Sequence, residues 1–276
     1  MVEKVLNVEG LHIDIPLAEG VLHAVDGVNL YVNKGETLCI VGESGCGKSL
    51  TSLAIMDLLP KAANKIVTAL DLSGTSILNH SQQQMSDIRG DKMAMIFQEP
   101  MTSLNPAYSI GNQLMEAMLR HKKISRGAAR DRAVELLQKV GINDAENRLR
   151  QFPHQLSGGL RQRVMIAMSL MCGPDLIIAD EPTTALDKFT QEKLIHDLKT
   201  LQKEKNLSIL FVSHDLNAVK EIADRIYIMK DGKLLESGNA DAIFKNPKHF
   251  YTRDLVASCP PDDKKLSELP TRKHFM

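Results

Sequence analysis

Residues 37–59 read TLCIVGESGCGKSLTSLAIMDLL. The apolar run 37–41 has the length and composition of a strand buried on both faces, and residues 49–59 predict a helix. The turn between them follows the phosphate-binding pattern G-x-x-x-x-G-K-S/T, in the strand–loop–helix setting that this pattern requires. We call residues 42–49 the phosphate loop and predict that they bind a nucleotide cofactor; they are Gly42, Glu43, Ser44, Gly45, Cys46, Gly47, Lys48 and Ser49.

The chemistry of a phosphate explains the spacing of this loop. Glycines allow backbone angles that turn successive N–H groups inward around an anion, and the helix N-terminus adds partial positive charge. We expect Lys48 to reach the β- and γ-phosphates of ATP, and the Ser49 hydroxyl to bind Mg²⁺. The alternative, a glycine-rich turn with a surface lysine, does not account for the flanking strand and helix.

Two adjacent carboxylates, Asp180 and Glu181, follow a second apolar strand at residues 176–179. Ligands of parallel sheets bind at the carboxyl ends of the strands. We therefore expect Asp180 near the phosphate loop, holding Mg²⁺ directly or through water. Glu181 is expected to point to the other side of an extended strand and to act as general base on the attacking water. The plainer interpretation is a strand that ends in solvated acids.

Strand-like segments alternate with helical patterns along the chain, which is typical of an α/β fold with a parallel sheet. Residues 99–155 differ, because they carry helical patterns and turn signals without a convincing strand. We predict an α/β core at 1–98 and 156–245, a helical insertion at 99–155 and a short C-terminal extension at 246–276. The expected strands are 5–8, 28–32, 37–41, 93–97, 176–179, 209–212 and 226–229, and the expected helices are 49–59, 128–140, 159–172 and 191–204.

The composition narrows the function classes. The 276 residues include 34 Lys and Arg against 34 Asp and Glu, so the formal net charge is zero, which argues against a nucleic-acid partner. A hydrophobic content of 43% excludes wholesale disorder. The longest apolar run, at residues 164–172, is too short to cross a bilayer, and we expect no signal peptide. Any link to a membrane is therefore expected to come through a partner.

The segment 156–162 (LSGGLRQ) resembles the LSGGQ-type signature of ABC transporter ATPases and, as in that family, lies shortly before the acidic strand. Three further matches follow the order of the family: Gln98 as the Q-loop glutamine, residues 184–187 as the D-loop and His214 as the switch histidine. The resemblance extends to about Leu255. It implies a P-loop NTPase core of the ABC ATPase type, with an inserted helical subdomain and a small N-terminal β subdomain.

The resemblance also implies roles for these residues. Two ATPase subunits of the family meet head to tail and hold two ATP molecules between the phosphate loop of one and the signature of the other. His214 would act on the γ-phosphate, and Gln98 would contact Mg²⁺ or the attacking water, so both join Glu181 as catalytic candidates. Ser157 as a helix N-cap and His214 as an ordinary polar residue are the plainer interpretations. The implied contacts with the partner's ATP are Ser157, Gly158, Gly159 and Asp187.

The peptide/nickel importer branch of the family is the most similar. Residues 95–106 (MIFQEPMTSLNP), 181–187 and 249–253 match its motifs. This implies an ATP-hydrolysing subunit that powers uptake of peptides or related solutes, including nickel or other metal chelates. The implied partners are transmembrane permease subunits, a second ATPase subunit (paralogous or identical) and, indirectly, an extracytoplasmic solute-binding protein. The implied location is the cytoplasmic face of the inner membrane, as a peripheral subunit.

Two features depart from that branch. Residues 10–20 lack the aromatic residue that often stacks on adenine, which leaves Ile13, Ile15 or Leu17 to cover the base. The C-terminal segment keeps only Cys259, which argues against an iron–sulfur cluster there. In addition, residues 120–132 hold six cations against one acid, which predicts either a surface for anionic lipid or, as the favoured interpretation, a solvated helical face.

Three alternative functions are weighed against this one. A soluble, non-transport ABC-type ATPase usually carries two fused cassettes or a long coiled coil, and the sequence has neither. A P-loop kinase leaves the signature 156–162 unexplained. A nucleotide-binding partner without turnover is disfavoured by the complete set Lys48, Asp180, Glu181 and His214.

Overall fold

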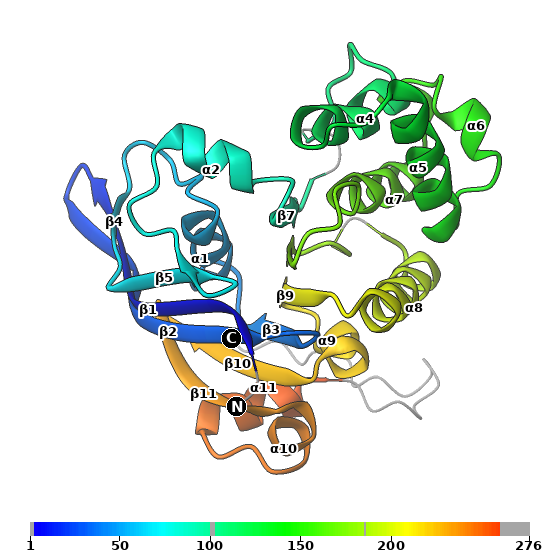
Figure 1. Ribbon diagram of the computed structural model, residues 1–276. Coiled ribbons are helices and arrows are strands. Elements are labelled where there is room, and N and C mark those ends of the chain that lie inside the picture. Colours follow the sequence, from blue (N-terminus) through cyan, green and yellow to red (C-terminus); the bar gives the residue numbers. More distant parts are fainter. Residues whose placement is uncertain (1–2, 100–102, 185, 260–276) are drawn as a thin grey trace, which may run out of the picture.

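The computed structural model describes residues 3–99, 103–184 and 186–259. Two sheets with helices around them form an α/β fold, which confirms the predicted fold class (Figure 1). The larger sheet has the order β11-β10-β3-β9-β8-β7, and its strands are parallel except for β11. These strands are β3 (Thr37–Val41), β7 (Met93–Ile96), β8 (Leu176–Asp180), β9 (Ser208–Ser213), β10 (Arg225–Lys230) and β11 (Lys233–Asn239).

Every residue of β3, β8 and β9 is buried, as expected for parallel strands covered on both faces. Alternate residues serve different cores. One core joins the sheet to the helices that follow β7 in the chain, and the other joins it to the antiparallel sheet. Cys39, Val41, Ile177, Ala179, Ile209 and Phe211 belong to the first core, and Leu38, Ile40, Leu176, Ile178, Leu210 and Val212 to the second.

The smaller, antiparallel sheet is built around a long hairpin. Its order is β2-β1-β5-β6, and β4 also pairs with β1. The expected strands 5–8 and 28–32 are correct but short, because the alternation of apolar residues continues through Leu11, Ile13 and Val25 into the hairpin. The strands are β1 (Lys4–Leu17), β2 (Gly20–Asn33), β4 (Asn64–Ile66), β5 (Ala69–Leu72) and β6 (Thr75–Ser76).

Helices occur at all the expected positions, but their ends differ from the expected ones by a few residues. The helix expected at 49–59 ends at Ile55, and Asp57 beyond it has a left-handed φ of 54°. The helix expected from 191 begins at Lys188, because Asp187 caps it. The helices are α1 (Lys48–Ile55), α2 (Gln82–Ile88), α4 (Ile110–His121), α5 (Arg126–Lys139), α6 (Ala145–Arg148), η1 (Pro153–Gln155), α7 (Gly158–Ser169), α8 (Lys188–Lys205), α9 (Leu216–Ile222), α10 (Ala240–Lys245) and α11 (Phe250–Ala257).

The segment between β7 and α7 is helical in its described part, residues 103–155, and contains no strand there. Figure 1 shows α4, α5 and α6 gathered beyond α7, away from the antiparallel sheet. Their apolar faces join the first core through α7. No helix within the described residues is both long and apolar enough to cross a bilayer.

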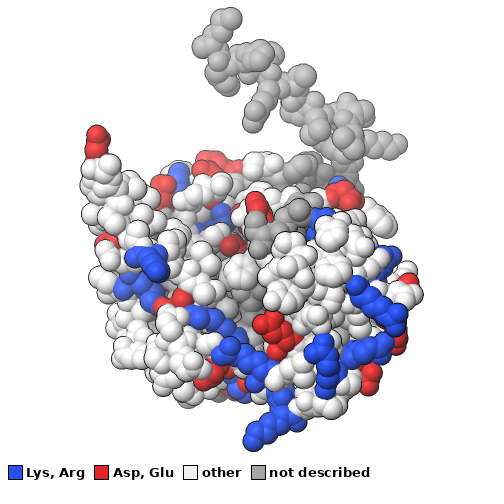
Figure 2. Space-filling model, turned by 90° about the horizontal axis from the view of Figure 1, so that it is seen from above, with Lys and Arg blue, Asp and Glu red and all other residues white. Residues whose placement is uncertain are grey.

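The basic segment 120–132 lies on α4, α5 and the turn between them. Figure 2 shows Lys and Arg side chains on the face seen from above, with Asp and Glu among them. Most cations of the segment have an acidic partner within this chain. The pairs are Arg120–Asp87 (3.7 Å), Lys122–Asp91 (2.5 Å), Arg130–Glu146 (2.5 Å) and Arg132–Glu135 (2.8 Å).

Arg225 on β10 ties the two sheets together. Its Nε lies 2.6 Å from Oε1 of Glu36, and its Nη2 donates to Oε2 of Glu36 at 3.1 Å and to the carbonyl oxygen of Tyr31 on β2 at 2.6 Å. The guanidinium also lies over the Tyr31 ring, 3.9 Å from its centroid. Because both charged side chains are only about one-tenth exposed, removing one of them leaves its partner buried without a counter-charge.

We predict that Arg225→Met lowers the free energy of unfolding by about 3 kcal/mol, because it leaves the buried Glu36 carboxylate without a counter-charge. Urea denaturation of the full chain measures this. Lys34→Met is the matched control, because the Lys34–Glu3 pair is about half exposed and its loss should cost less than about 1 kcal/mol. Equal effects of the two substitutions would contradict the buried role of Arg225.

Candidate functional site

The phosphate loop leaves the carboxyl end of β3 and is pressed against β2 and β10. A Cβ atom on Gly42 would lie 2.1 Å from the carbonyl oxygen of Met229 and 2.7 Å from Sγ of Cys46. Gly47 has a φ of 105°, and a Cβ there would lie 2.5 Å from the carbonyl oxygen of Ala24. At both positions the neighbouring backbone leaves no room for a side chain, which is the physical reason for glycine.

Lys48 begins α1 and folds back over the loop. Its Nζ donates to the carbonyl oxygens of Gly42 and Glu43, each at 2.8 Å, and its side chain is buried. The loop therefore encloses a fixed positive charge beside its own N–H groups. Such a concave, cationic loop at a helix N-terminus is suited to a phosphate anion.

Asp180 meets the start of α1 across the sheet. The Ser49 hydroxyl donates to Oδ1 of Asp180 at 2.9 Å, and Asp180 as a whole is 6% exposed. Burial raises the pKa of Asp180 above its usual value, and the neighbouring Glu181 adds to this, whereas Ser49 and Lys48 oppose it. A buried carboxylate beside a hydroxyl offers the hard oxygen ligands that Mg²⁺ prefers, so the predicted pair fits this ion.

Glu181 corrects one expectation. It is not part of an extended strand, because β8 ends at Asp180 and Glu181 takes a left-handed φ of 47°. Its N–H donates to the carbonyl oxygen of Val212 on β9 at 2.9 Å, which fixes the turn. A non-glycine residue in this region is strained and persists where surrounding contacts hold it. The contact with the neighbouring strand β9, rather than alternation along β8, therefore sets the direction of the Glu181 side chain.

The Glu181 carboxylate brings together side chains from three other places in the chain. Gln98 donates its Nε2 to Oε2 at 3.1 Å, and Nδ1 of His214 lies 3.1 Å from Oε1. The Glu181 side chain is 9% exposed, whereas that of His214 is 50% exposed. The sequence predicted these three residues as catalytic candidates. It did not assign a contact to Thr184, which donates its hydroxyl to Oε2 at 3.0 Å; the spacing of three residues after Glu181 is the available signal.

The signature and D-loop residues make local contacts within this chain. Ser157 caps α7 by accepting from the N–H of Leu160 at 3.4 Å, as its plainer interpretation predicted. Asp187 caps α8, and hydrogen bonds from Thr190 lower the pKa of its carboxyl. Gly158 has open space around the position of a Cβ atom. Since α1 packs in the second core and α7 in the first, the two helix N-termini serve different faces of the sheet.

The structure also tests which apolar residues could cover a nucleotide base. Ile13 is fully buried and paired with Val25 in the antiparallel sheet, so it presents no surface to a base. Ile15 is partly buried, and Leu17 is 56% exposed. The candidates thus reduce to Ile15 and Leu17.

An apolar groove opens where β7 ends. It has a volume of about 300 Å³, and segments far apart in sequence line it, which is why the sequence did not reveal it. Phe97, which follows β7 and is 39% exposed, lines the groove next to Gln98, the partner of Glu181. We call this the apolar groove, and its side chains include Met56, Leu58, Ala94, Met95, Phe97, Leu104, Met165 and Met168.

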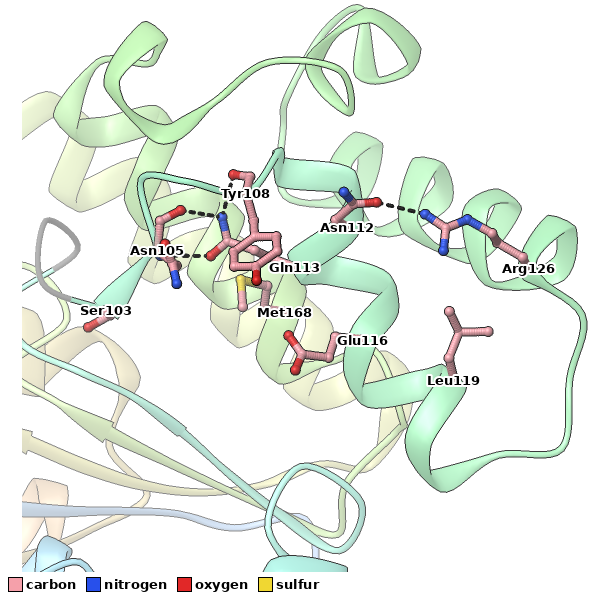
Figure 3. A pocket seen from close by; sticks show the side chains of 9 residues that line it. All are labelled: Ser103, Asn105, Tyr108, Asn112, Gln113, Glu116, Leu119, Arg126 and Met168. Carbon is pink, nitrogen blue, oxygen red and sulfur yellow. Dashed lines mark hydrogen bonds between the residues drawn. The ribbon is translucent and has the colours of Figure 1, made fainter.

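A larger polar hollow of about 670 Å³ lies beside the apolar groove and shares Ser103 and Met168 with it (Figure 3). Gln113 on α4 holds one wall by donating to the carbonyl oxygens of Asn105 and Tyr108, each at 2.9 Å. The segment next to these walls falls partly outside the described residues: residues 100–102 of the Q-loop motif, together with residue 185 of the D-loop and 260–276 of the extension, are not described.

Comparisons with known proteins agree with this geometry. The family model described as ABC transporter matches residues 25–184. The dipeptide transport ATP-binding protein DppD of Bacillus subtilis is 47% identical over 97% of this chain and 80% of its own length. The oligopeptide transport ATP-binding protein OppD of the same organism is 48% identical over 94% of this chain and 73% of its own length.

Solved structures show the same fold. The ATP-binding cassette MJ0796, in a dimeric post-hydrolysis state bound to ADP and phosphate, superposes with a TM-score of 0.77 at 28% identity, covering 85% of this chain and 98% of that one. The protein cbiO1 of Clostridium perfringens, part of an ABC transporter complex, has a TM-score of 0.75 at 26% identity, covering 88% of this chain and 92% of that one.

We predict that Gly42→Ala weakens ATP binding at least about tenfold, or about 1.4 kcal/mol, because the loop must move away from Met229. Calorimetric titration of the full chain with ADP and a non-hydrolysable ATP analogue measures this. Gly127→Ala on α5 is the control: its Cβ meets only Ser125 Oγ at 3.8 Å, so binding should not change. Parental affinity in Gly42→Ala would contradict the steric argument.

Proposed function

This chain belongs to the ABC transporter family as an ATP-binding subunit with ATPase activity, and we propose that it powers the uptake of peptides through separate membrane subunits. Its relatives DppD and OppD are peptide transport proteins, which favours peptides over nickel chelates as the solute. One observation carries the proposed site: Gln98, Thr184 and His214 all contact the buried carboxylate of Glu181. The preceding residue, Asp180, accepts a hydrogen bond from Ser49.

In the proposed mechanism the phosphate loop binds the β- and γ-phosphates. Lys48 exchanges the carbonyl oxygens of Gly42 and Glu43 for phosphate oxygens, and backbone N–H groups of the loop complete the cradle. Ser49 and Asp180 would hold Mg²⁺, which neutralises the charge of the phosphates when it is bound. Burial raises the pKa of Asp180, and a nearby cation would favour its charged form.

Glu181 acts as the general base in this mechanism. Its carboxylate accepts the proton of the attacking water, and the contacts from Gln98 and His214 set its direction. His214 is half exposed, so it can reach a phosphate as well as Glu181. Gln98 connects the carboxylate to the apolar groove, because Phe97 beside it lines that groove.

A second ATPase subunit completes the site in this proposal. At the starts of α7 and α8, Ser157, Gly158 and Asp187 are exposed and Gly159 is half-buried, so this surface is open to a second chain although Ser157 and Asp187 also cap their own helices. A helix N-terminus with open space at Gly158 suits the phosphates of a nucleotide held by another chain. The related cassette MJ0796 is dimeric in two solved structures, which supports a pair of ATPase subunits.

The membrane partner would dock at the apolar groove. An amphipathic helix from a permease subunit can place apolar side chains in the groove and polar ones in the neighbouring hollow. Docking there would couple the membrane subunits to Gln98 and Glu181 and would hold this chain at the cytoplasmic face of the inner membrane. An extracytoplasmic solute-binding protein would deliver the solute to the permease, without contacting this chain.

We predict that Glu181→Gln leaves the Kd for ATP within about threefold of the parent but lowers hydrolysis at least about 100-fold, because the general base is lost. Phosphate release measures hydrolysis, and light scattering detects the ATP-bound dimer that should accumulate. Glu204→Gln, on the exposed end of α8, is the isosteric control and should leave both unchanged. Hydrolysis at the parental rate in Glu181→Gln would remove Glu181 from the mechanism.

We predict that Phe97→Asp abolishes co-purification with membrane permease subunits, because it places a charge in the apolar groove, while the isolated chain binds ATP as before. Affinity purification from membranes followed by mass spectrometry tests this. Ile66→Asp, at a 64% exposed position on β4, is the control and should leave assembly intact. If Phe97→Asp still assembles, the groove is not the docking site.

A further inference from the structure

The helix α11 reaches back to the phosphate loop, although 208 residues separate the two contacting positions. Tyr251 on this helix is 6% exposed, and its hydroxyl accepts a hydrogen bond from the N–H of Glu43 at 3.4 Å. Figure 1 shows α11 next to β10, the strand whose Met229 carbonyl confines Gly42. The mechanism proposed above gives Tyr251 no role.

The bond to Tyr251 acts on a single peptide unit. The carbonyl of Gly42 and the N–H of Glu43 belong to the same planar, trans peptide and point in opposite directions. On one side the carbonyl accepts from Nζ of Lys48 at 2.8 Å, and on the other the N–H donates to Tyr251. The rotation of this peptide is therefore held from both sides, by the lysine that is to meet phosphate and by a tyrosine of the C-terminal helix.

The Tyr251 ring is itself fixed by β10 and β11. The Lys230 ammonium lies 4.6 Å from the centroid of the ring. Glu236 on β11 accepts the backbone N–H groups of Lys248 and His249, at 2.8 and 3.0 Å, and so holds the start of α11. The turn between β10 and β11 also supports the loop directly, since the N–H of Gly232 donates to the carbonyl oxygen of Cys46 at 3.1 Å.

We infer that Tyr251 is a positioning residue for nucleotide binding, a role that rests on the proposed function of the phosphate loop. When a phosphate draws Lys48 away from the Gly42 carbonyl, the Tyr251 hydroxyl is the contact that keeps the 42–43 peptide in place. A loop that stays ordered through this exchange loses less conformational freedom on binding, which strengthens the binding of both ATP and ADP. Tyr251 touches neither phosphate nor water in this role, so it alters affinity and not the chemical step.

The test is Tyr251→Phe in the full chain, which removes the hydroxyl and keeps the ring. The Kd for ADP and for a non-hydrolysable ATP analogue, both with Mg²⁺, should rise about threefold to tenfold, the range for one neutral hydrogen bond. In steady-state assays the KM for ATP should rise by the same factor, with kcat within about twofold of the parent. Thermal unfolding without nucleotide shows whether the variant is folded.

Tyr227→Phe is the matched control. Tyr227 is equally buried at 6%, and its hydroxyl accepts from Nη1 of Arg225 at 3.0 Å, away from the phosphate loop. Its nucleotide affinity should equal that of the parent. Tyr251→Phe with the affinity of Tyr227→Phe, or with a lowered kcat at unchanged KM, overturns the inference. If the parent chain itself binds neither nucleotide, the proposed function fails instead, so the two failures are distinguishable.

Discussion

The parallel pairing of β3, β9 and β8 is the constraint on which the site depends. Val41 pairs with Ser213, and Asp180 pairs with Val212, so the three strands end almost level at one edge of the sheet. The segments that follow these ends are the phosphate loop, the Asp180–Glu181 turn and His214. Hydrogen bonding between the strands thus sets the distances between the side chains of these three segments, which are far apart in sequence. Burial of both faces of the strands keeps this register from slipping.

Much of this edge could be predicted from the sequence, for physical reasons. A strand buried on both faces must be an unbroken apolar run, so β3, β8 and β9 are visible as such. A loop that binds phosphate needs glycine where backbones meet, as at Gly42 and Gly47, and lysine and serine at fixed offsets. Once the strands are parallel, their carboxyl ends must share an edge, which predicts Asp180 near the phosphate loop; in the structure it accepts from Ser49 of that loop.

The remaining features depend on tertiary contacts. The extended backbone expected at Glu181 was wrong, because its left-handed turn is held by Val212 on the neighbouring strand. The partly buried strand β11 has only Leu234 and Leu235 as apolar residues and shows no alternation, and the short β4 to β6 exist only by pairing with β1 or each other. The apolar groove and the contact of Tyr251 with Glu43 are formed by segments that are distant in sequence. No local sequence pattern indicates which of these residues come together.

The order of these contacts along the chain has a consequence for synthesis on the ribosome. The phosphate loop is synthesised early, but its contacts are made by residues far along the chain. Asp180 follows Ser49 by 131 residues, and Tyr251 follows Glu43 by 208 residues. Closing such long loops costs chain entropy before any contact rewards it. A nascent chain that ends inside the helical segment therefore has the loop sequence without its supports. Nucleotide binds only when this edge of the sheet is assembled. It therefore stabilises the complete subunit and not the incomplete nascent chain.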